Sequence, residues 1–357
     1  MNPNKLLVTA DLHCNEERYR DSEQLMISIG VTAVREECLN VILVGDVWDE
    51  RHSPPIKVLL MIRDQLIKWA EMGLHVYWIR GNHEISTKSK PEQSYICFFE
   101  SLHQNIFIIN EPTHIYFGAD ICAWMVPWYP PQEIIDIYKR TAGEAFYTKG
   151  ARVKLLFSHI GISEGQVSPS NKHTLNSPVR FEHLLAQYYN MVFLGDIHIF
   201  QWLGSNTFYC GCPIQLTYGD KPNQGVWVYD ASLGGGTLKN VGLELSGKQP
   251  FPEYKTYQIT DTAQLYTLLE PDYNYIKLRC SPDTYAAAQA KFGERRRYTI
   301  EKLAPTKSVI PKGRMEGVQE NQTSIILSLL IESMGLQQYP EYHELAMWYL
   351  INTGEMK

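Results

Sequence analysis

Six short segments of the chain place residues that can bind metal ions directly after an apolar stretch. Their notable residues are Asp11 and His13, Asp46 and Asp49, Asn82 with His83 and Glu84, His159, Asp196 with His198, and the turn Gly211-Cys212-Pro213. Each segment is a weak signal when read singly, and an isolated histidine is more often structural than a metal ligand. Because all six follow apolar runs, they jointly indicate a two-metal hydrolase centre built from the loops of a sheet.

The chemistry that such a centre supports is hydrolysis of a phosphate ester. Two divalent ions roughly 3.5 to 4 Å apart can activate a water and stabilise charge on the phosphoryl oxygens. Asp46 is the natural bridging ligand, since it lies at the tip of the predicted strand 41–44. A mixture of histidine, aspartate and asparagine ligands suits manganese, iron or zinc better than calcium.

The elements that must position these residues alternate between strands and helices in the first part of the chain. The hydrophobic pattern predicts strand 6–10, helix 21–38, strand 41–44, helix 56–72 and strand 76–79. This β-α-β-α-β order is typical of a largely parallel sheet covered by helices. Functional groups of such sheets collect at the carboxyl ends of the strands, where the motifs lie.

The pattern changes to short strands after residue 106. We expect strands at 106–109, 114–117, 121–126, 153–157, 191–194, 207–209, 226–229 and 238–243, and a helix at 131–146. The whole predicts an α/β fold of two sheets packed face to face, with helices outside. A linker near 247–252 then leads to a small α+β domain, a second linker rich in proline, glycine and charge, and two helical patterns.

The composition is that of an ordinary globular protein, with 357 residues, 44% hydrophobic and 20% charged residues. No apolar run approaches the roughly 18 residues that span a membrane, and we expect neither a membrane association nor a signal peptide. Seven scattered cysteines indicate reduced thiols, and hence a cytoplasmic protein. The net charge of −6 argues against a general polyanion binder but not against a nuclease, because metal-binding carboxylates contribute to it. Basic residues gather around Arg295, Arg296 and Arg297, which form either a solvated face or a DNA contact.

These motifs resemble those of the calcineurin-like metallophosphoesterases, and most closely those of SbcD-type nuclease subunits of double-strand-break repair complexes. The family motifs are D-x-H, G-D-x-x-D, G-N-H-[DE], an isolated histidine after a strand, and G-H-x-H. Further SbcD-like segments are Trp48-Asp49 before Ser53-Pro54-Pro55, Met125-Val126-Pro127-Trp128, and Tyr209 to Pro213 leading to Gly225 to Asp230. The last segment looks especially like bacteriophage members. The resemblance covers the first 245 residues well and the remainder loosely.

The resemblance implies a role for each motif residue. One metal would be held by Asp11, His13, Asp46 and His198, and the other by Asp46, Asn82, His159 and Asp196. His83 would donate a proton or contact the transition state, while Glu84 and Asp49 would orient their neighbours. Asp196 replaces the first histidine of G-H-x-H. It either ligates, favouring Mn²⁺ or Mg²⁺ over softer ions, or it faces away and leaves the second site weak.

The resemblance also implies domains, a function and partners. A nuclease domain would span residues 1–247, a DNA-capping domain 254–304, a linker 305–319, and a helical segment 320–357 that docks on an SbcC-type ATPase. The expected activity is exo- and endonucleolytic cleavage of single-stranded DNA and duplex ends, with two divalent ions, Mn²⁺ rather than Mg²⁺. The expected assembly is a homodimer within a heterotetramer that acts in DNA repair, recombination and replication, in the host cytoplasm if the protein comes from a phage.

Two other functions fit parts of the sequence. The same centre could serve a phosphatase or phosphodiesterase that acts on a smaller ester, although such an enzyme would have no use for residues 256–357. A non-catalytic scaffold that had lost its ligands would show gaps at Asp46, Asn82 or His83, and the chain has none.

Overall fold

The computed structural model describes residues 1–303, except 52, 86–93, 119, 168–173, 223, 233–235, 245–249, 269–273 and 296. The chain divides into two units, Met1–Leu303 and Ala304–Lys357. The predicted linker 305–319, the helical segment 320–357 and Arg296 therefore lie outside the described residues.

The first sheet has six strands in the order β12-β11-β1-β2-β3-β4. Its strands are β1 (Asn2–Thr9), β2 (Cys38–Val44), β3 (His75–Ile79), β4 (Ile106–Ile109), β11 (Val226–Asp230) and β12 (Thr237–Val241). Strands β1 to β4 are parallel, and the antiparallel pair β11 and β12 extends the sheet beyond β1. Helices α1 (Tyr19–Arg35) and α2 (Ile56–Glu71) connect the parallel strands. Along α2, Val58, Ile62, Leu66 and Trp69 are buried at the spacing of one helix face.

The second sheet has six strands in the order β5-β6-β7-β8-β10-β9. Its strands are β5 (Thr113–Phe117), β6 (Ile121–Val126), β7 (Val153–His159), β8 (Met191–Gly195), β9 (Gln201–Trp202) and β10 (Thr207–Tyr209). The four central strands are parallel, and the edge strands β5 and β9 are antiparallel. Helix α3 (Pro131–Tyr147) connects β6 to β7, and short 3₁₀ helices lie at Tyr95–Phe99, Phe181–Leu184 and Ala186–Tyr188.

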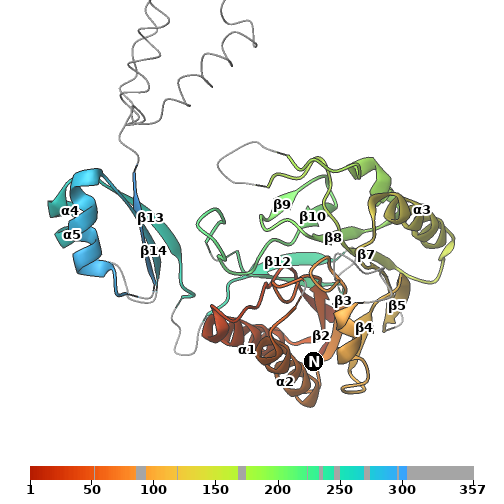
Figure 1. Ribbon diagram of the computed structural model, residues 1–357. Helices are drawn as coiled ribbons and strands as arrows, with labels where there is room; N and C mark the ends of the chain where they lie inside the picture. The colour runs from red at the N-terminus through yellow and green to blue at the C-terminus, as the bar shows by residue number, and fades with distance from the viewer. Residues whose placement is uncertain are drawn as a thin grey trace, which may run out of the picture. The chain divides into compact units, whose positions relative to one another are not determined.

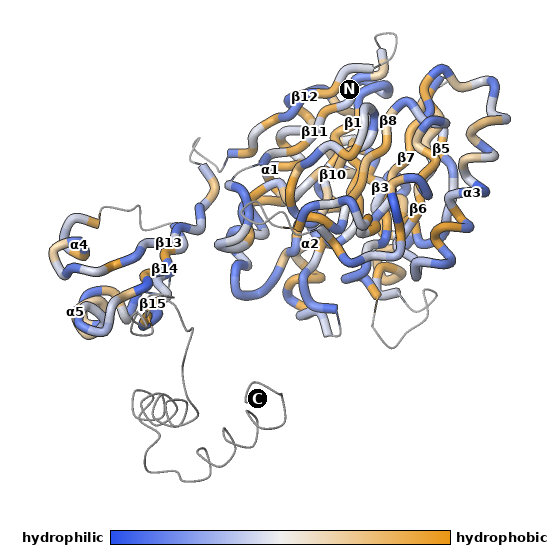
Figure 2. The backbone as a smooth tube through the Cα atoms, turned by 90° about the horizontal axis from the view of Figure 1, so that it is seen from above, coloured by the Kyte–Doolittle hydropathy of each residue, from blue (hydrophilic) through white to orange (hydrophobic). Residues whose placement is uncertain are grey.

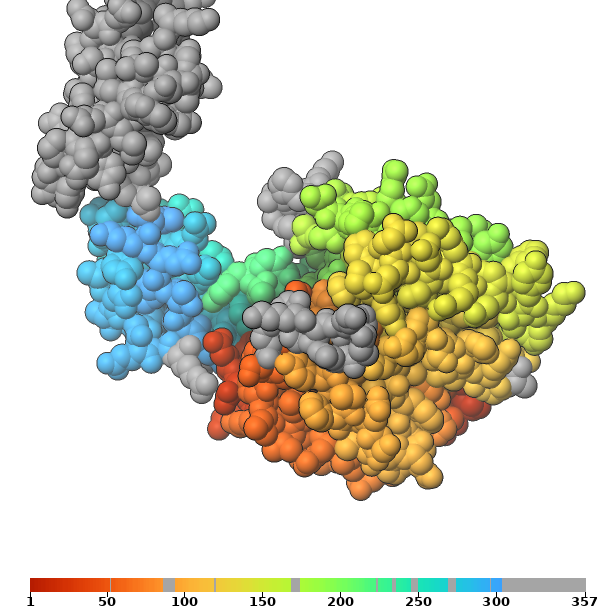
Figure 3. Space-filling model, turned by 45° about the vertical axis from the view of Figure 1, so that its right-hand side comes forward, coloured from red at the N-terminus to blue at the C-terminus, as the bar shows by residue number. Residues whose placement is uncertain are grey.

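The two sheets pack face to face over a core of fully buried side chains that includes Val8, Ile42, Phe157 and Phe193. A second core layer joins the outer face of the first sheet to α1 and α2, and a third joins the second sheet to α3 (Figure 1). Hydrophobic residues concentrate along the strands, whereas α3 carries many hydrophilic residues (Figure 2). In Figure 3 the orange segment near residue 100 and the yellow segment near residue 140 form one closely packed surface.

A third, smaller sheet contains β13 (Tyr254–Ile259), β14 (Tyr275–Cys280) and β15 (Tyr298–Lys302), all parallel. Helices α4 (Thr262–Thr267) and α5 (Pro282–Phe292) complete it. Its own core includes Ile276, Leu278 and Phe292.

The predicted fold class is confirmed, since two sheets lie face to face with helices outside. The predicted helix 21–38 was wrong at its carboxyl end: the helix ends at Arg35, and Cys38 begins β2 instead. Glu37 has a φ of 59°, so the chain reverses there and cannot continue the helix. No helix within the described ranges is long and apolar enough to cross a membrane.

Candidate metal centre

The predicted ligands come from loops at the carboxyl ends of neighbouring strands in both sheets. The loop after β1 carries Asp11 and His13, β2 leads to Asp46, β3 to Asn82, β7 ends at His159, and β8 leads to Asp196 and His198. Glycines let the two sheets approach closely here. A Cβ at Gly45 would lie 2.3 Å from His159 Nδ1, and one at Gly195 would lie 2.3 Å from the Val44 carbonyl oxygen. Larger residues at either position would push the two sheet ends apart.

Four of the predicted ligands have a positive φ angle, a backbone conformation that residues other than glycine rarely adopt. The φ angles are 55° for Asp11, 45° for His13, 53° for Asp46 and 93° for Asp196. Such strained residues persist where the surrounding structure holds them, and they cluster at functional sites. Here the sharp turns after the strands point successive polar side chains toward one centre.

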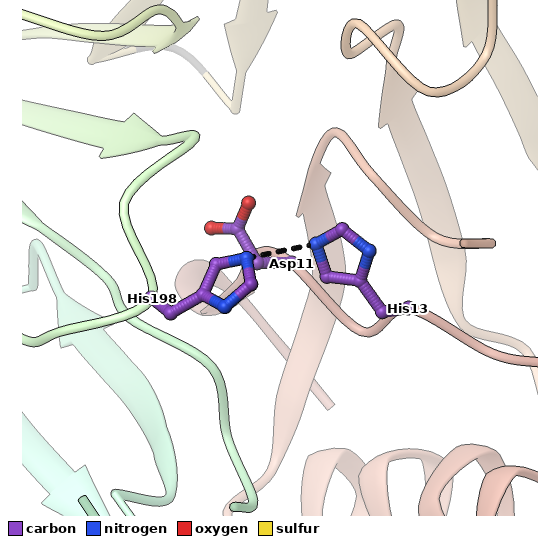
Figure 4. A group of neighbouring side chains, drawn as sticks. All are labelled: Asp11, His13 and His198. Carbon is purple, nitrogen blue, oxygen red and sulfur yellow. Dashed lines mark hydrogen bonds between the residues drawn. The ribbon is translucent and has the colours of Figure 1, made fainter. Parts of the chain in front are cut away.

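The first ligand group consists of Asp11, His13 and His198, whose side chains face one another (Figure 4). Nε2 of His13 lies 3.0 Å from Nε2 of His198. Nδ1 of His13 lies 3.1 Å from Oδ1 of Asp49, so the Nδ1–H group donates to this carboxylate. That tautomer leaves Nε2 as the metal-binding nitrogen. Burial lowers the pKa of His13 to about 4, which keeps its imidazole neutral.

The second ligand group lies around His159, which is completely buried. Its Nδ1 lies 2.7 Å from the Val44 carbonyl oxygen and therefore donates a hydrogen bond. Its Nε2 is buried without a hydrogen-bond partner, 3.2 Å from Oδ2 of Asp46 and 3.7 Å from Oδ1 of Asp196. A buried nitrogen that faces two carboxylates fits a metal ligand, and this fit supports a second ion in the centre.

Asp46 lies between the two groups, as expected for a bridging ligand. Its Oδ2 is 3.2 Å from Nε2 of His159, 3.7 Å from Nε2 of His83 and 3.9 Å from Nε2 of His13. Burial opposes ionisation of this carboxyl group, but His159, His83 and His13 reverse the effect and lower its pKa. Asp46 is thus an anion that both halves of the centre share.

Asp196 points into the centre, as ligation requires. Its Oδ1 accepts a hydrogen bond of 2.8 Å from Nδ2 of Asn82, and its backbone N–H donates to both carboxylate oxygens of Asp11, at 3.0 and 3.2 Å. The carboxylate that replaces the family's histidine therefore occupies a ligand's place, and its ligation remains a prediction.

His83 lies at the rim of the centre, with its side chain 16% exposed. Its Nδ1 contacts the Asp49 carbonyl oxygen, and its backbone N–H donates to Oδ1 of Asp46 at 2.9 Å. The predicted proton-donor role fits this position. The ligand atoms of His83, His13 and Asp46 also lie within 4.8 Å of one another, close enough to hold a metal ion together.

Glu84 and Asp49 both hold the loops of the centre, Glu84 from the interior and Asp49 from the half-exposed end of the ligand group. Glu84 is completely buried and accepts hydrogen bonds from the backbone N–H groups of Gly81, Asp46 and Val47, at 2.6, 3.0 and 2.8 Å. Asp49 orients His13 and accepts a bond of 3.3 Å from Nδ2 of Asn15. Both contacts agree with the orienting role that the motifs imply.

Two residues near the centre were missed by the sequence analysis. Arg51 places Nη2 3.2 Å from Oδ1 of Asn82 and 3.1 Å from Nε2 of His83. Asp220 places Oδ1 3.7 Å from Nδ1 of His198. Arg51 lies two residues after the G-D-x-x-D motif, and this position could have identified it from the sequence. Asp220 belongs to no motif, so no sequence feature pointed to it.

A cleft of about 1250 Å³ extends from Asn15 and Asp49 to the third sheet. Its lining includes five basic residues and five tyrosines: Arg18, Arg20, Lys57, Arg295, Arg297, Tyr19, Tyr218, Tyr254, Tyr275 and Tyr298. Of the predicted DNA-contacting arginines, Arg295 and Arg297 therefore line the same cleft as Asp49, whose carboxylate contacts His13 of the first ligand group. Nη2 of Arg297 lies 3.2 Å from Oδ1 of Asp21, and its guanidinium lies over the Tyr275 ring.

The sequence model of the family described as Calcineurin-like phosphoesterase matches residues 4–209, which contain every predicted metal ligand. No curated protein sequence matches the chain. Similar solved structures include a dimetal phosphatase from Danio rerio, with 11% identity, a TM-score of 0.48, and coverage of 67% of this chain and 96% of that chain. Another is GAP50, the anchor in the inner membrane complex of Plasmodium, with 9% identity, a TM-score of 0.44, and coverage of 69% and 90%.

Proposed function

Because the chain belongs to the calcineurin-like phosphoesterase family, we propose that it is a two-metal phosphodiesterase that cleaves DNA, as an SbcD-type nuclease. The observation that carries this proposal is a cleft that begins at Asp49, the hydrogen-bond partner of His13, and is lined by arginines and tyrosines. The family itself accounts for the metal-dependent hydrolysis of a phosphoester. The inference that the substrate is DNA depends on the cleft.

The residues of the chain divide the work of hydrolysis among them. When bound, two divalent ions would activate a water molecule and stabilise negative charge on the phosphoryl oxygens. We expect both ions to be Mn²⁺, which suits the mixture of histidine, aspartate and asparagine ligands. Asp46 serves both halves of the ligand set, and Asp49 keeps Nε2 of His13 turned inward. His83, at the exposed rim, is placed to donate a proton to the leaving oxygen. Arg51, beside His83, is placed to contact a phosphoryl oxygen.

The cleft suits a polynucleotide better than a small ester. Arginine and lysine side chains neutralise successive phosphates, and aromatic rings give surfaces on which bases stack. Tyr254 and Tyr275 are stacked on each other, with ring centroids 4.4 Å apart. A substrate with a single phosphate would use only the end of the cleft at Asp49.

One observation favours the alternative, a phosphatase or phosphodiesterase that acts on a smaller ester. Glu16, Glu17 and Asp21 line the same cleft, and Asp21 pairs with Arg297. These carboxylates repel a polyanion and reduce the positive charge available to it.

A cleavage assay separates the two functions. In the presence of MnCl₂, we expect cleavage of labelled single-stranded DNA and duplex ends, and loss of it in Asp46→Asn. Asp136→Asn is the matched control, because this exposed aspartate on α3 pairs with Lys139 far from any predicted ligand in sequence. Arg20→Ala and Lys57→Ala should raise KM for DNA but not for p-nitrophenyl phosphate. Hydrolysis of the chromogenic ester alone would support the alternative.

We also propose the partner interactions that the resemblance implies: docking of residues 320–357 on an SbcC-type ATPase, and a homodimer within a heterotetramer in the cytoplasm. The support is the helical spacing of Ile325, Ile326, Leu329 and Leu330, and of Leu345, Trp348 and Ile351. Deletion of residues 320–357 should leave a soluble chain that cleaves single-stranded DNA but no longer co-purifies with the ATPase. Undiminished co-purification would place the interface elsewhere.

A further inference from the structure

The imidazole of His198 has a carboxylate behind it. Nε2 of His198 faces Nε2 of His13 at 3.0 Å, on the side where a metal would bind. Nδ1, on the opposite side of the ring, lies 3.7 Å from Oδ1 of Asp220. This is the distance of an ion pair, and a carboxylate on this side favours a proton on Nδ1, which leaves Nε2 to bind a metal.

Asp220 is itself held in a fixed direction. Its Oδ2 accepts hydrogen bonds from the backbone N–H of Thr217 at 2.8 Å and from the Thr217 hydroxyl at 2.9 Å. The Leu216 N–H lies 3.3 Å from the same oxygen. Because these donors bind Oδ2, Oδ1 remains directed at His198. The Asp220 side chain is only 10% exposed, which limits competition from water.

The backbone of His198 is fixed separately by Gln224. Nε2 of this side chain donates to the carbonyl oxygens of His198 and Cys212, at 2.6 and 3.0 Å. Its Oε1 accepts from the Phe200 N–H at 2.7 Å. Gln224 thus places the His198 main chain, whereas the side chains of Asp220 and Cys212 contact its ring, and Asp220 is the charged one of the two.

The loop that carries Asp220 is joined to the third sheet by Gln215, which is 5% exposed. Oε1 of Gln215 accepts from the Tyr254 N–H at 2.9 Å, and Nε2 lies 3.1 Å from the Tyr254 carbonyl oxygen. The same Nε2 lies 3.1 Å from the carbonyl oxygens of Thr217 and Asp220. One buried amide therefore binds both the first residue of β13 and the loop at Asp220.

We propose that Asp220 is the positioning residue for the metal-binding face of His198, and that Gln215 couples it to β13 of the third sheet. A shift of β13 would then change the orientation of one metal ligand. This places the metal centre under the influence of the small sheet that also lines the cleft. The proposal rests on the metal centre of the proposed function, but not on DNA as the substrate.

Calorimetric titration of the metal-free full-length chain with MnCl₂ tests the proposal. Asp220→Asn should lower the affinity for one of the two Mn²⁺ ions by roughly 10- to 100-fold and leave the affinity for the other unchanged. His198→Ala identifies which ion this is, and Asp220→Asn should add no further loss in the His198→Ala background. Gln215→Ala should lower the affinity for the same ion by a smaller factor. Combined with Asp220→Asn, it should cause no additional loss of affinity.

Asp136→Asn is the matched control and should bind both ions as the unchanged chain does. Unchanged Mn²⁺ affinity in Asp220→Asn would overturn the positioning role, and so would an equal loss of both ions together with a lowered Tm. Unchanged affinity in Gln215→Ala would overturn the coupling to β13. The titration needs no substrate, so an absence of DNA cleavage would count against the proposed function and not against this inference.

Discussion

Nε2 of His13 lies 3.0 Å from Nε2 of His198, although 185 positions separate the two residues in the sequence. His13 follows β1 of the first sheet, and His198 follows β8 of the second. The two nitrogens meet because both sheets present the carboxyl ends of their parallel strands at the same edge. With Asp11, they form a ligand group of the kind that binds a divalent ion.

Asp46→Asn should abolish Mn²⁺-dependent hydrolysis, because Oδ2 of Asp46 faces histidines of both ligand groups. An amide cannot provide the shared negative charge. The measurements are the cleavage rate and the metal content, with Asp136→Asn as the control. Full activity with two bound ions would refute the bridging role.

His83→Ser should retain both metals and reduce hydrolysis by roughly 10²- to 10⁴-fold, the usual contribution of a general acid. The expectation follows from the position of His83 at the rim of the centre. Metal analysis alongside the rate decides the role. Loss of an ion would show that His83 is a ligand, as its grouping with His13 and Asp46 allows.

Arg51→Ala should leave metal content unchanged and reduce kcat/KM by roughly 10- to 100-fold, the effect of one charge-assisted hydrogen bond. Its guanidinium lies beside His83 and Asn82, and the expectation follows from the proposed contact of this cation with a phosphoryl oxygen of the substrate. Arg51→Lys keeps the charge and should recover part of the loss. An unaffected rate in Arg51→Ala would exclude the contact.

Asp196→His should preserve activity and shift the metal preference toward a softer ion such as Zn²⁺, because an imidazole replaces an oxygen ligand. The side chain at this position points toward His159 and Asn82. Relative affinities for Mn²⁺ and Zn²⁺ measure the shift. An unchanged preference would indicate that residue 196 does not ligate.

Metal binding should release protons, and Mn²⁺ affinity should increase as the pH rises. Burial lowers the pKa of His198, but Cys212, Asp220 and Asp11 reverse this and raise it to about 12. Burial likewise opposes the raised pKa of His159, which Asp46, Asp11 and Asp196 cause. Both imidazoles are therefore positively charged at neutral pH in the metal-free chain, and a bound ion must displace one of the two ring protons.

The proton release is measured by titrating MnCl₂ into the metal-free chain in buffers that differ in ionisation enthalpy. His198→Ala should release fewer protons than the unchanged chain. His13 contributes none at neutral pH, because its pKa is lowered to about 4. Binding enthalpies that do not depend on the buffer would contradict the raised pKa values of His159 and His198.

The sequence by itself determined the fold class and the set of candidate ligands. Strands and helices differ in hydrophobic period, so β1, α2 and β7 could be located from the pattern of apolar residues. Ligands that follow strands were identifiable because parallel strands bring their carboxyl ends to one edge. The local pattern failed at Glu37, where a positive φ ended the helix early.

Only the tertiary structure decided which atoms meet. The direction of the Asp196 carboxylate, the contact of Arg51 with His83, and the approach of Asp220 to His198 depend on turns and on distant segments. A hydrophobic period carries no information about such contacts, because polar side chains in loops follow no period. The sequence identified Arg297 only as one residue of a basic cluster. Its contact with Asp21, 276 positions away, depends on the fold.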